Sequence, residues 1–406
     1  MRPAAAHHRS DLRAPSVGAA RATASGLCAS LVGIGLARFA YTPLLPAIIG
    51  AHWFEPSAAA YLGAANLAGY LAGALLARPM ARGAPTTLVL RAMMALATAA
   101  FFACAYPLSF SWFFLWRFAA GLSGGALMVL AAPTVLPHVP PSRRGLAGGV
   151  IFMGVGIGIA ASGTLVPLLL RQGLTETWLG LGALALLLTL LAWNGWPDDA
   201  AAAAAPATTR RSRPTTALRA LYAEYGLNAV GLVPHMIFLV DFVARGLGQG
   251  LEVGAGYWVL FGLGAMVGPL LAGRLADGAG FGSALRLAYC IEAFAVALPA
   301  FGLGPVWLML SSVIVGAFTP GIVPLVLGRV HELLAHHPAD QKAAWSMATT
   351  SFAVLQALAA YGMSFLFAHG GGDYRLLFGL GAGAIALALA LDLVAAIAGR
   401  VDRQDA

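Results

Sequence analysis

The sequence predicts an all-α integral membrane protein in which twelve transmembrane helices form two pseudo-symmetric six-helix bundles. The residues are 60% apolar and only 10% charged, with a mean hydropathy of +0.81. A water-soluble fold needs more polar residues than this to cover its surface. Apolar runs of about 20 residues, the length that crosses a bilayer, recur along the chain. A nine-residue pattern in the first half also returns in the second half.

Turn-forming Pro and Gly residues divide the apolar runs into twelve predicted helices. In the first half they span 22–50, 57–79, 86–106, 109–136, 145–170 and 175–196. In the second half they span 218–244, 253–275, 283–303, 305–333, 343–369 and 374–399. The N-terminal bundle is therefore 22–196 and the C-terminal bundle is 218–399. Residues 1–21, the polar linker 197–217 and residues 400–406 are expected to be cytoplasmic.

The repeated pattern supports a duplicated bundle. Gly69-Tyr-Leu-Ala-Gly73-Ala-Leu-Leu-Ala77 matches Gly264-Ala-Met-Val-Gly268-Pro-Leu-Leu-Ala272 at an offset of 195 residues. Each copy closes an apolar run and is expected to lead into a charged loop. Parallel repeats related by an axis along the membrane normal are a construction that transporters use.

The basic residues predict the orientation in the membrane. With the N-terminus inside, only three of the 24 Lys and Arg residues fall in outer loops, namely Arg171, Arg245 and Arg375. Arg38 and Arg117 lie within helices. Cytoplasmic loops carry an excess of basic residues, so both termini are expected on the cytoplasmic side. The same distribution explains the net charge of +8 without nucleic acid as a partner.

Three further segments resemble a known transporter family. Gly273-Arg-Leu-Ala-Asp277-Gly-Ala-Gly280 resembles the cytoplasmic signature of the major facilitator superfamily, and the first-half copy has Arg78 and Arg82 where Gly and Asp would fall. Arg117, followed by Gly121 and Gly124, resembles its fourth-helix motif. Gly33-Ile-Gly-Leu-Ala-Arg38-Phe-Ala-Tyr41-Thr42-Pro43-Leu-Leu-Pro46 resembles the first helix of its YbfB/YjiJ branch. The resemblance implies the major facilitator fold, a multi-pass protein of the inner (plasma) membrane, and a central cavity surrounded by helices 1, 4, 7 and 10.

Arg38 is the strongest candidate for a substrate-binding residue. A charge at the centre of a membrane helix costs about 2.5–3.5 kcal/mol on insertion scales, so such residues usually face a cavity or a partner. At about 100° per residue, Arg38, Tyr41 and Thr42 share one helix face. We expect these three residues to contact substrate, with gating or packing as the alternative. Pro43 and Pro46 are expected to bend this helix.

Arg117 is the second buried charge. Gly121 and Gly124, four and seven residues later, leave room for another backbone beside it. The functional interpretation is anion binding or assistance with proton coupling, and the structural alternative is pairing with a buried carboxylate or carbonyl group. The aligned position in the second half is Ser312, so the charge is not duplicated.

Polar residues also mark the seventh, tenth and eleventh helices. Glu224, Asn228 and His235 follow one face of the seventh helix, and membrane Glu and His residues can relay protons. We expect Asn228 and His235 to line the cavity, with Glu224 and His235 as candidates for proton coupling. Interfacial charge is the alternative for Glu224, and a neutral hydrogen bond to another helix is the alternative for His235.

Two other features complete the candidate site. Gln356 lies on a polar stripe of the eleventh helix, either in the cavity or holding two helices together. Pro320 and Pro324 are expected to interrupt the tenth helix and to form a gate, together with the motif residues described above (Arg78, Arg82, Gly273, Asp277 and Gly280). No phosphate-binding loop, metal-ligand spacing or cysteine pair is present in the sequence, so no cofactor or metal is expected.

The sequence therefore predicts a monomeric secondary active transporter in the lipid bilayer, not an enzyme. Two buried arginines in one half favour a small anionic or carboxylate-bearing substrate, and proton coupling remains open. A membrane sensor with the transporter fold but without turnover is the main alternative. An integral membrane transferase is a weaker alternative, because the sequence shows no paired acid and base or nucleophile with supporting spacing.

Overall fold

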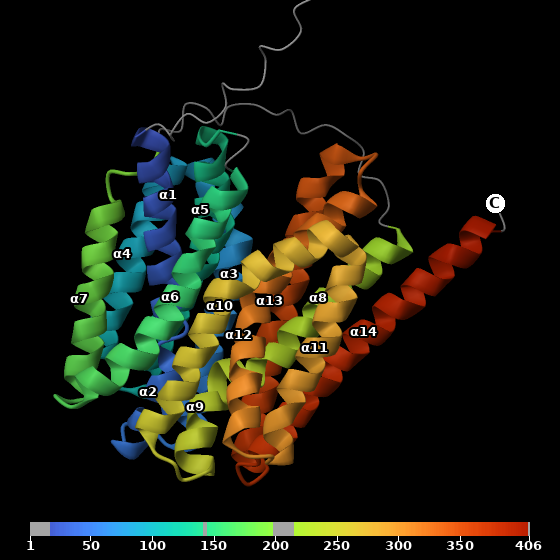
Figure 1. Ribbon diagram of the computed structural model, residues 1–406. Coiled ribbons are helices and arrows are strands. Elements are labelled where there is room, and N and C mark those ends of the chain that lie inside the picture. Colours follow the sequence, from blue (N-terminus) through green and yellow to red (C-terminus); the bar gives the residue numbers. More distant parts are fainter. Residues whose placement is uncertain (1–16, 141–143, 198–214, 405–406) are drawn as a thin grey trace, which may run out of the picture.

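The computed structural model describes residues 17–140, 144–197 and 215–404 (Figure 1). Within these residues the ordered elements are all helical. Twelve segments are long and apolar enough to cross a membrane, from Gly18–Gly50 to Tyr374–Ile397. The predicted all-α class with twelve spans is confirmed, and the chain is a multi-pass membrane protein. The predicted linker falls almost entirely outside the described residues, as do the predicted N-terminal tail up to residue 16 and the last two residues of the C-terminal tail.

The first half contains spans one to six. Its elements are α1 (Val17–Ser30), η1 (Leu31–Leu36), α2 (Tyr41–Gly50), α3 (Pro56–Gly83), α4 (Thr86–Cys104), α5 (Phe110–Val135), η2 (Leu136–His138), α6 (Arg144–Leu170) and α7 (Leu174–Ala192). The second half contains α8 (Thr216–Val233), η5 (Pro234–Phe238), α9 (Leu239–Asp241), η6 (Phe242–Gly246), α10 (Leu251–Ala279), α11 (Phe281–Phe301), α12 (Pro305–Leu333), α13 (Pro338–His369) and α14 (Tyr374–Gln404).

Spans one and seven are broken, although single helices were expected at 22–50 and 218–244. Span one changes from α1 to the π-helical η1, then to a turn at residues 37–40 and to α2. The turn comes just before Pro43, which has no N–H to donate to the carbonyl group four residues earlier. Span seven contains the π-helical segments η5, which begins at Pro234, and η6. Such π segments are frequently found at functional sites.

The helices that carry the duplicated motif run further than predicted. Helix α3 ends at Gly83, where Ala84 takes an extended conformation before Pro85. Helix α10 ends at Gly280, whose φ of +77° suits glycine. The prediction that each copy of the motif leads directly into a charged loop is therefore corrected. Arg78 and Asp277 belong to the final turns of the two helices.

The tenth span is also corrected. Helix α12 runs without a break from Pro305 to Leu333, with Pro320 and Pro324 inside it. A proline in a membrane helix removes one backbone hydrogen bond, and packing against neighbouring helices tolerates the loss. These two residues therefore do not interrupt the helix.

Glycine contacts show the internal repeat directly. A Cβ on Gly69 would lie 2.0 Å from the carbonyl oxygen of Phe118, and a Cβ on Gly264 would lie 2.1 Å from that of Val313. Phe118 and Val313 are also 195 residues apart. The same offset relates two more pairs, Gly73 with Leu122 to Gly268 with Ala317, and Gly121 with Asn66 to Gly316 with Phe261. The crossings α3–α5 and α10–α12 are thus equivalent and too close for any larger residue.

The two halves meet along three contacts. Helix α6 packs on α10, α3 packs on α13, and α2 packs on η5, α9 and α10. By contrast, α1 packs on α5, α6, α7 and η1 of its own half, and α8 packs on α11, α12, α13 and α14 of its own half. Figure 1 shows α2 and α9 near the end of the molecule away from the chain termini. Spans one and seven are therefore closed against each other on that side.

Candidate functional site

A small cavity lies between the halves, beside the break in span one. Its volume is about 10 Å³, which is room for about one water molecule. The lining residues come from span one, α3, α5 and η5: Arg38, Tyr41, Thr42, Gly63, Asn66, Leu67, Arg117, Met236 and Ile237. The structure thus brings together four residues predicted from sequence, namely Arg38, Tyr41, Thr42 and Arg117.

Arg38 lies in the turn between η1 and α2, and it reaches across to the second half. Its Nη2 donates a hydrogen bond of 2.6 Å to Oε1 of Gln356 on α13 and lies 3.8 Å from the sulfur of Met236. Its guanidinium carbon lies 4.8 Å from the ring centroid of Tyr70, a cation–π contact. Its Nε has no hydrogen-bond partner.

Arg117 on α5 is held against the break in span one. Its Nη1 donates a hydrogen bond of 2.9 Å to the carbonyl oxygen of Ala37, and its guanidinium carbon lies 4.3 Å from the ring centroid of Tyr41. Asn66 donates to the same carbonyl oxygen at 3.5 Å and to that of Arg117 at 3.1 Å. Arg117 is only 2% exposed, and its Nε is unpartnered. The carbonyl partner foreseen as a structural alternative is therefore present, beside the cavity.

The cavity is cationic. Among the described residues, ion pairs join Arg171 to Glu252, Arg245 to Asp241, Arg286 to Asp392 and Arg329 to Glu332. Neither cavity arginine takes part in one of them. Buried charges are normally paired, because removing a charge from water is expensive. Two guanidinium groups beside one cavity, without a carboxylate, form a site that an anion would neutralise.

Other predicted residues form the contacts between the halves. The Thr42 hydroxyl donates a hydrogen bond to the backbone carbonyl of Met236. Gln356 accepts from Arg38 and places its Nε2 3.5 Å from the Met236 sulfur. Tyr41 donates its hydroxyl to the carbonyl oxygen of Ala59 at 2.7 Å, so only its ring serves the cavity. Met236 was missed from sequence, yet it lies 195 residues after Tyr41, so the repeat itself signals it.

The polar stripe of span seven lies elsewhere. The structure does not place Asn228 or His235 in the wall of the cavity. His235 has its Nε2 2.8 Å from the hydroxyl of Ser311 and packs between Phe261 and Phe378, which is the helix-to-helix bond foreseen as the alternative. Asn228 and Glu224 are buried within the second half. The bonds of Asn228 and His235 go to Glu292 on α11 and Ser311 on α12, both in the second half.

The motif residues lie at the side of the molecule that carries the termini. Arg78 and Arg82 are exposed at the end of α3. Gly273 faces open space. At the end of α10, the positive φ of residue 280 favours glycine, so Gly280 has a structural role. The side chain of Asp277 is outside the described part of the structure.

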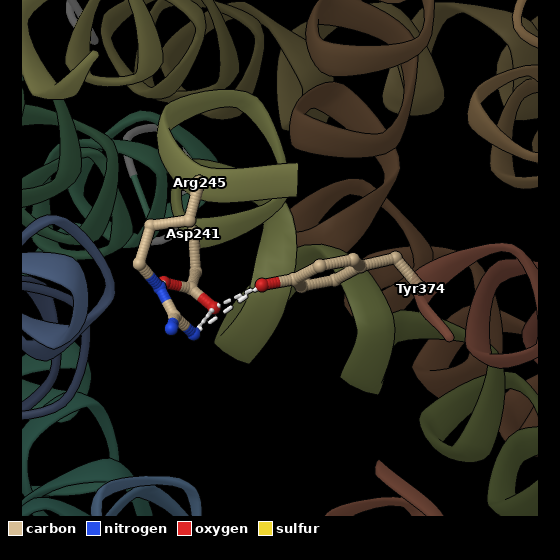
Figure 2. A network of polar contacts seen from close by, with 3 residues as sticks. All are labelled: Asp241, Arg245 and Tyr374. Carbon is tan, nitrogen blue, oxygen red and sulfur yellow. Dashed lines mark hydrogen bonds and ion pairs between the residues drawn. The ribbon is translucent and has the colours of Figure 1, made fainter. Parts of the chain in front are cut away.

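At the other end of span seven, away from the termini, a polar network joins this span to α14 (Figure 2). Arg245 donates to both carboxylate oxygens of Asp241, and the Tyr374 hydroxyl donates to Oδ2 of Asp241 at 2.6 Å. Asp241 is fully buried. Arg245 and Tyr374 also line a surface pocket of about 440 Å³ that includes Pro56 at the start of α3. This network ties the end of span seven to the start of α14.

Comparisons with known proteins agree with this architecture. Residues 30–393 match the family described as "Uncharacterised MFS-type transporter YbfB". No curated protein matches the chain. Similar solved structures include a D-xylose–proton symporter, with 16% identity and a TM-score of 0.68 over 91% of this chain and 96% of that chain. The nucleoside transporter NupG has 13% identity and a TM-score of 0.70 over 94% and 100% of the two chains.

A third similar structure is a bacterial homologue of the human lysosomal transporter Spinster, in an inward-facing and occupied conformation. It has 15% identity and a TM-score of 0.62, over 93% of this chain and 94% of that chain. At these identities the structural likenesses show the fold, while the match over residues 30–393 shows the family. The chain therefore belongs to the YbfB-type family of major facilitator superfamily transporters.

Proposed function

We propose that this protein is a secondary active transporter that moves a small anionic or carboxylate-bearing solute by alternating access. The observation that carries the proposal is the pair Arg38 and Arg117, which lie beside one cavity between the halves without a carboxylate partner among the described residues. An arginine side chain presents a planar set of donors that matches carboxylate and phosphate groups. Each of these two has an Nε free to donate.

The cavity of about 10 Å³ is too small for a solute, so substrate entry requires the halves to separate. The contacts that would break are Arg38 with Gln356 and Thr42 with Met236, because both join the halves at the site. An anion that accepts hydrogen bonds from Arg38 would replace Gln356 as its partner. Solute binding would then be linked to the movement of α13 relative to span one.

The fold alone does not set the substrate. The structural neighbours named above are described as carrying a sugar or a nucleoside. The sign of charge in this cavity is what supports an anion. Cytoplasmic termini, an inner-membrane location and a monomeric state belong to the same proposal, and they are supported by the distribution of basic residues and by the family.

The test uses the purified full chain. A panel of small anions, cations and neutral solutes is screened by thermal shift, and hits are tested for flux in proteoliposomes. We expect anionic hits whose affinity falls in R38Q and R117Q but not in R219Q, a control at an exposed arginine. Binding without flux would indicate a sensor. Hits that are all neutral or cationic, or unchanged affinity in both cavity variants, would refute the proposed site.

A further inference from the structure

The core of the second half contains a polar cluster separate from the cavity. Asn228 on α8 donates a hydrogen bond of 2.6 Å from Nδ2 to Oε2 of Glu292 on α11. Glu224 lies one helical turn before Asn228, and Tyr289 lies one turn before Glu292. All four residues are at most 1% exposed. Glu224, Glu292, Tyr225 and Asp392 lie within electrostatic range of the Tyr289 hydroxyl, and the bond from Asn228 to Glu292 joins α8 to α11.

Each of the four side chains leaves a buried polar atom without a partner. These atoms are Oε2 of Glu224, Oδ1 of Asn228, the hydroxyl of Tyr289 and Oε1 of Glu292. An ionised carboxylate and an amide oxygen only accept hydrogen bonds. With both Glu residues ionised, the group would hold three unpartnered acceptors and one unpartnered donor, the Tyr289 hydroxyl, which makes no hydrogen bond to any of them. Protonation of one carboxyl group turns a hydrogen-bond acceptor into an O–H donor, and it also removes a buried charge.

Arg286, Arg329 and Asp392 lie within electrostatic range of Glu224, but neither arginine forms an ion pair with it. Arg286 on α11 pairs with Asp392 on α14, and Arg329 pairs with Glu332 on α12. On α8 itself the next residue after Glu224 is Tyr225. Its ring packs on Trp345 and Phe352 of α13, and α13 also places the hydroxyl of Ser351 on the backbone of α8. No Lys or Arg among the described residues lies within ion-pair distance of Glu224 or Glu292.

The fold does not require this cluster. At the offset of 195 residues, the four polar residues correspond to Ala29, Gly33, Met94 and Ala97 of the first half. Helices α4 and α11 begin at equivalent positions, Thr86 and Phe281. The equivalent place in the first half is thus packed with apolar residues. Ionisable groups inside membrane spans mark proton relays or ion pathways more often than structural features.

We propose that Glu224 and Glu292 form a proton-binding site inside the second half, with Tyr289 and Asn228 completing its hydrogen bonds. A proton from water on the side of the termini enters past Arg286, whose side chain is 27% exposed and pairs with Asp392, one turn from Tyr289. It binds a free carboxylate oxygen, neutralises that group, and leaves by the same route when the helices move apart. No other group is consumed or released.

The site is linked to the cavity by a short chain of contacts. Ala295 lies one turn beyond Glu292, and its carbonyl oxygen accepts a hydrogen bond of 2.7 Å from Ser311. The Ser311 hydroxyl lies 2.8 Å from Nε2 of His235, and the next residue, Met236, lines the cavity. Proton occupancy would therefore bias the packing of span seven, which also carries the contacts to Arg38 and Thr42. This coupling step rests on the proposed function, whereas proton occupancy itself does not.

The experiment measures carboxyl protonation by infrared spectroscopy on the full chain in nanodiscs. At pH 7 we expect the carbonyl stretch of a protonated carboxylic acid in the unmodified protein, a weaker band in E292Q and E224Q, and a shifted band in Y289F. The control E252Q changes a residue whose side chain is 80% exposed, and it should leave the band unchanged. No such band, or the same band in all variants, would overturn the proton site.

Two further measurements separate the remaining possibilities. Replacing choline chloride by sodium chloride should leave the band unchanged, since loss of the band with sodium would identify a sodium site instead. In proteoliposomes, transport of any identified solute should respond to an imposed pH gradient in the unmodified protein and not in E292Q. A pH-independent flux would overturn the coupling step while leaving the infrared result intact.

Discussion

A single added methyl group at Gly121 should disturb both the packing of the first half and its cationic cavity. A Cβ at this position would lie 1.8 Å from the carbonyl oxygen of Asn66. Real Cβ atoms stay at least about 3 Å from such an oxygen, so α3 and α5 must move apart by about 1 Å. Backbone atoms block the site, and no side-chain rotation can relieve the clash. Overpacking of this kind costs about 1–3 kcal/mol.

The displacement also reaches the proposed anion site. Asn66 bonds the carbonyl oxygens of Ala37 and Arg117, so moving α3 alters the position of both. We therefore expect G121A to have lower thermal stability than the unmodified protein and weaker binding of any anionic hit. The measurements are unfolding in detergent and affinity by thermal shift.

Two further variants make this prediction specific. G316A repeats the change at the equivalent crossing, where a Cβ would lie 2.0 Å from the carbonyl oxygen of Phe261, and it should destabilise without altering the arginines. G256A lies on α10, where a Cβ would meet nothing within 4 Å, and it should not destabilise. Equal stability of all three variants would show that these helix crossings are not as close as described.

Three other changes have defined outcomes. R38Q and R117Q should weaken anion binding about ten- to a hundredfold. A hydrogen bond to a charged group contributes about 1.5–3 kcal/mol, and each 1.4 kcal/mol changes the affinity tenfold. Unchanged affinity would contradict this prediction. Q356L removes the partner of Arg38 across the halves and should open the site, seen as faster labelling of a cysteine introduced at the cavity residue Leu67 (L67C), whereas slower labelling argues against it. Y374F leaves an oxygen of buried Asp241 without its 2.6 Å hydrogen bond and should cost about 1–3 kcal/mol of stability. Y106F, at an exposed tyrosine, is its control.

Hydrophobicity and repetition were sufficient to predict the architecture. Length and polarity define the spans because a bilayer allows few alternatives to a helix. The same reasoning identified Arg38 and Arg117, since a charge inside a span needs an explanation. The structure places both beside one cavity.

Sequence alone could not say which neighbour a helix face meets. The spacing of Glu224, Asn228 and His235 predicts one shared face, but spacing along one helix does not reveal that Asn228 bonds to α11 and His235 to α12. The contact between Asn228 and Glu292 could not be predicted for the same reason, since the two residues are 64 apart along the chain. The π-helical segments also escaped prediction, because η1 and η6 contain no proline and only η5 begins with one.

The equivalent glycine crossings have a consequence for where the molecule can bend. Each crossing presses one backbone against another with no side chain between them, so α3 with α5, and α10 with α12, can only travel as locked pairs. The segments that remain free to bend are the irregular ones, η1 in span one and η5 in span seven. Segment η1 ends two residues before Arg38, and η5 contains Met236, so the irregular segments adjoin the proposed substrate site.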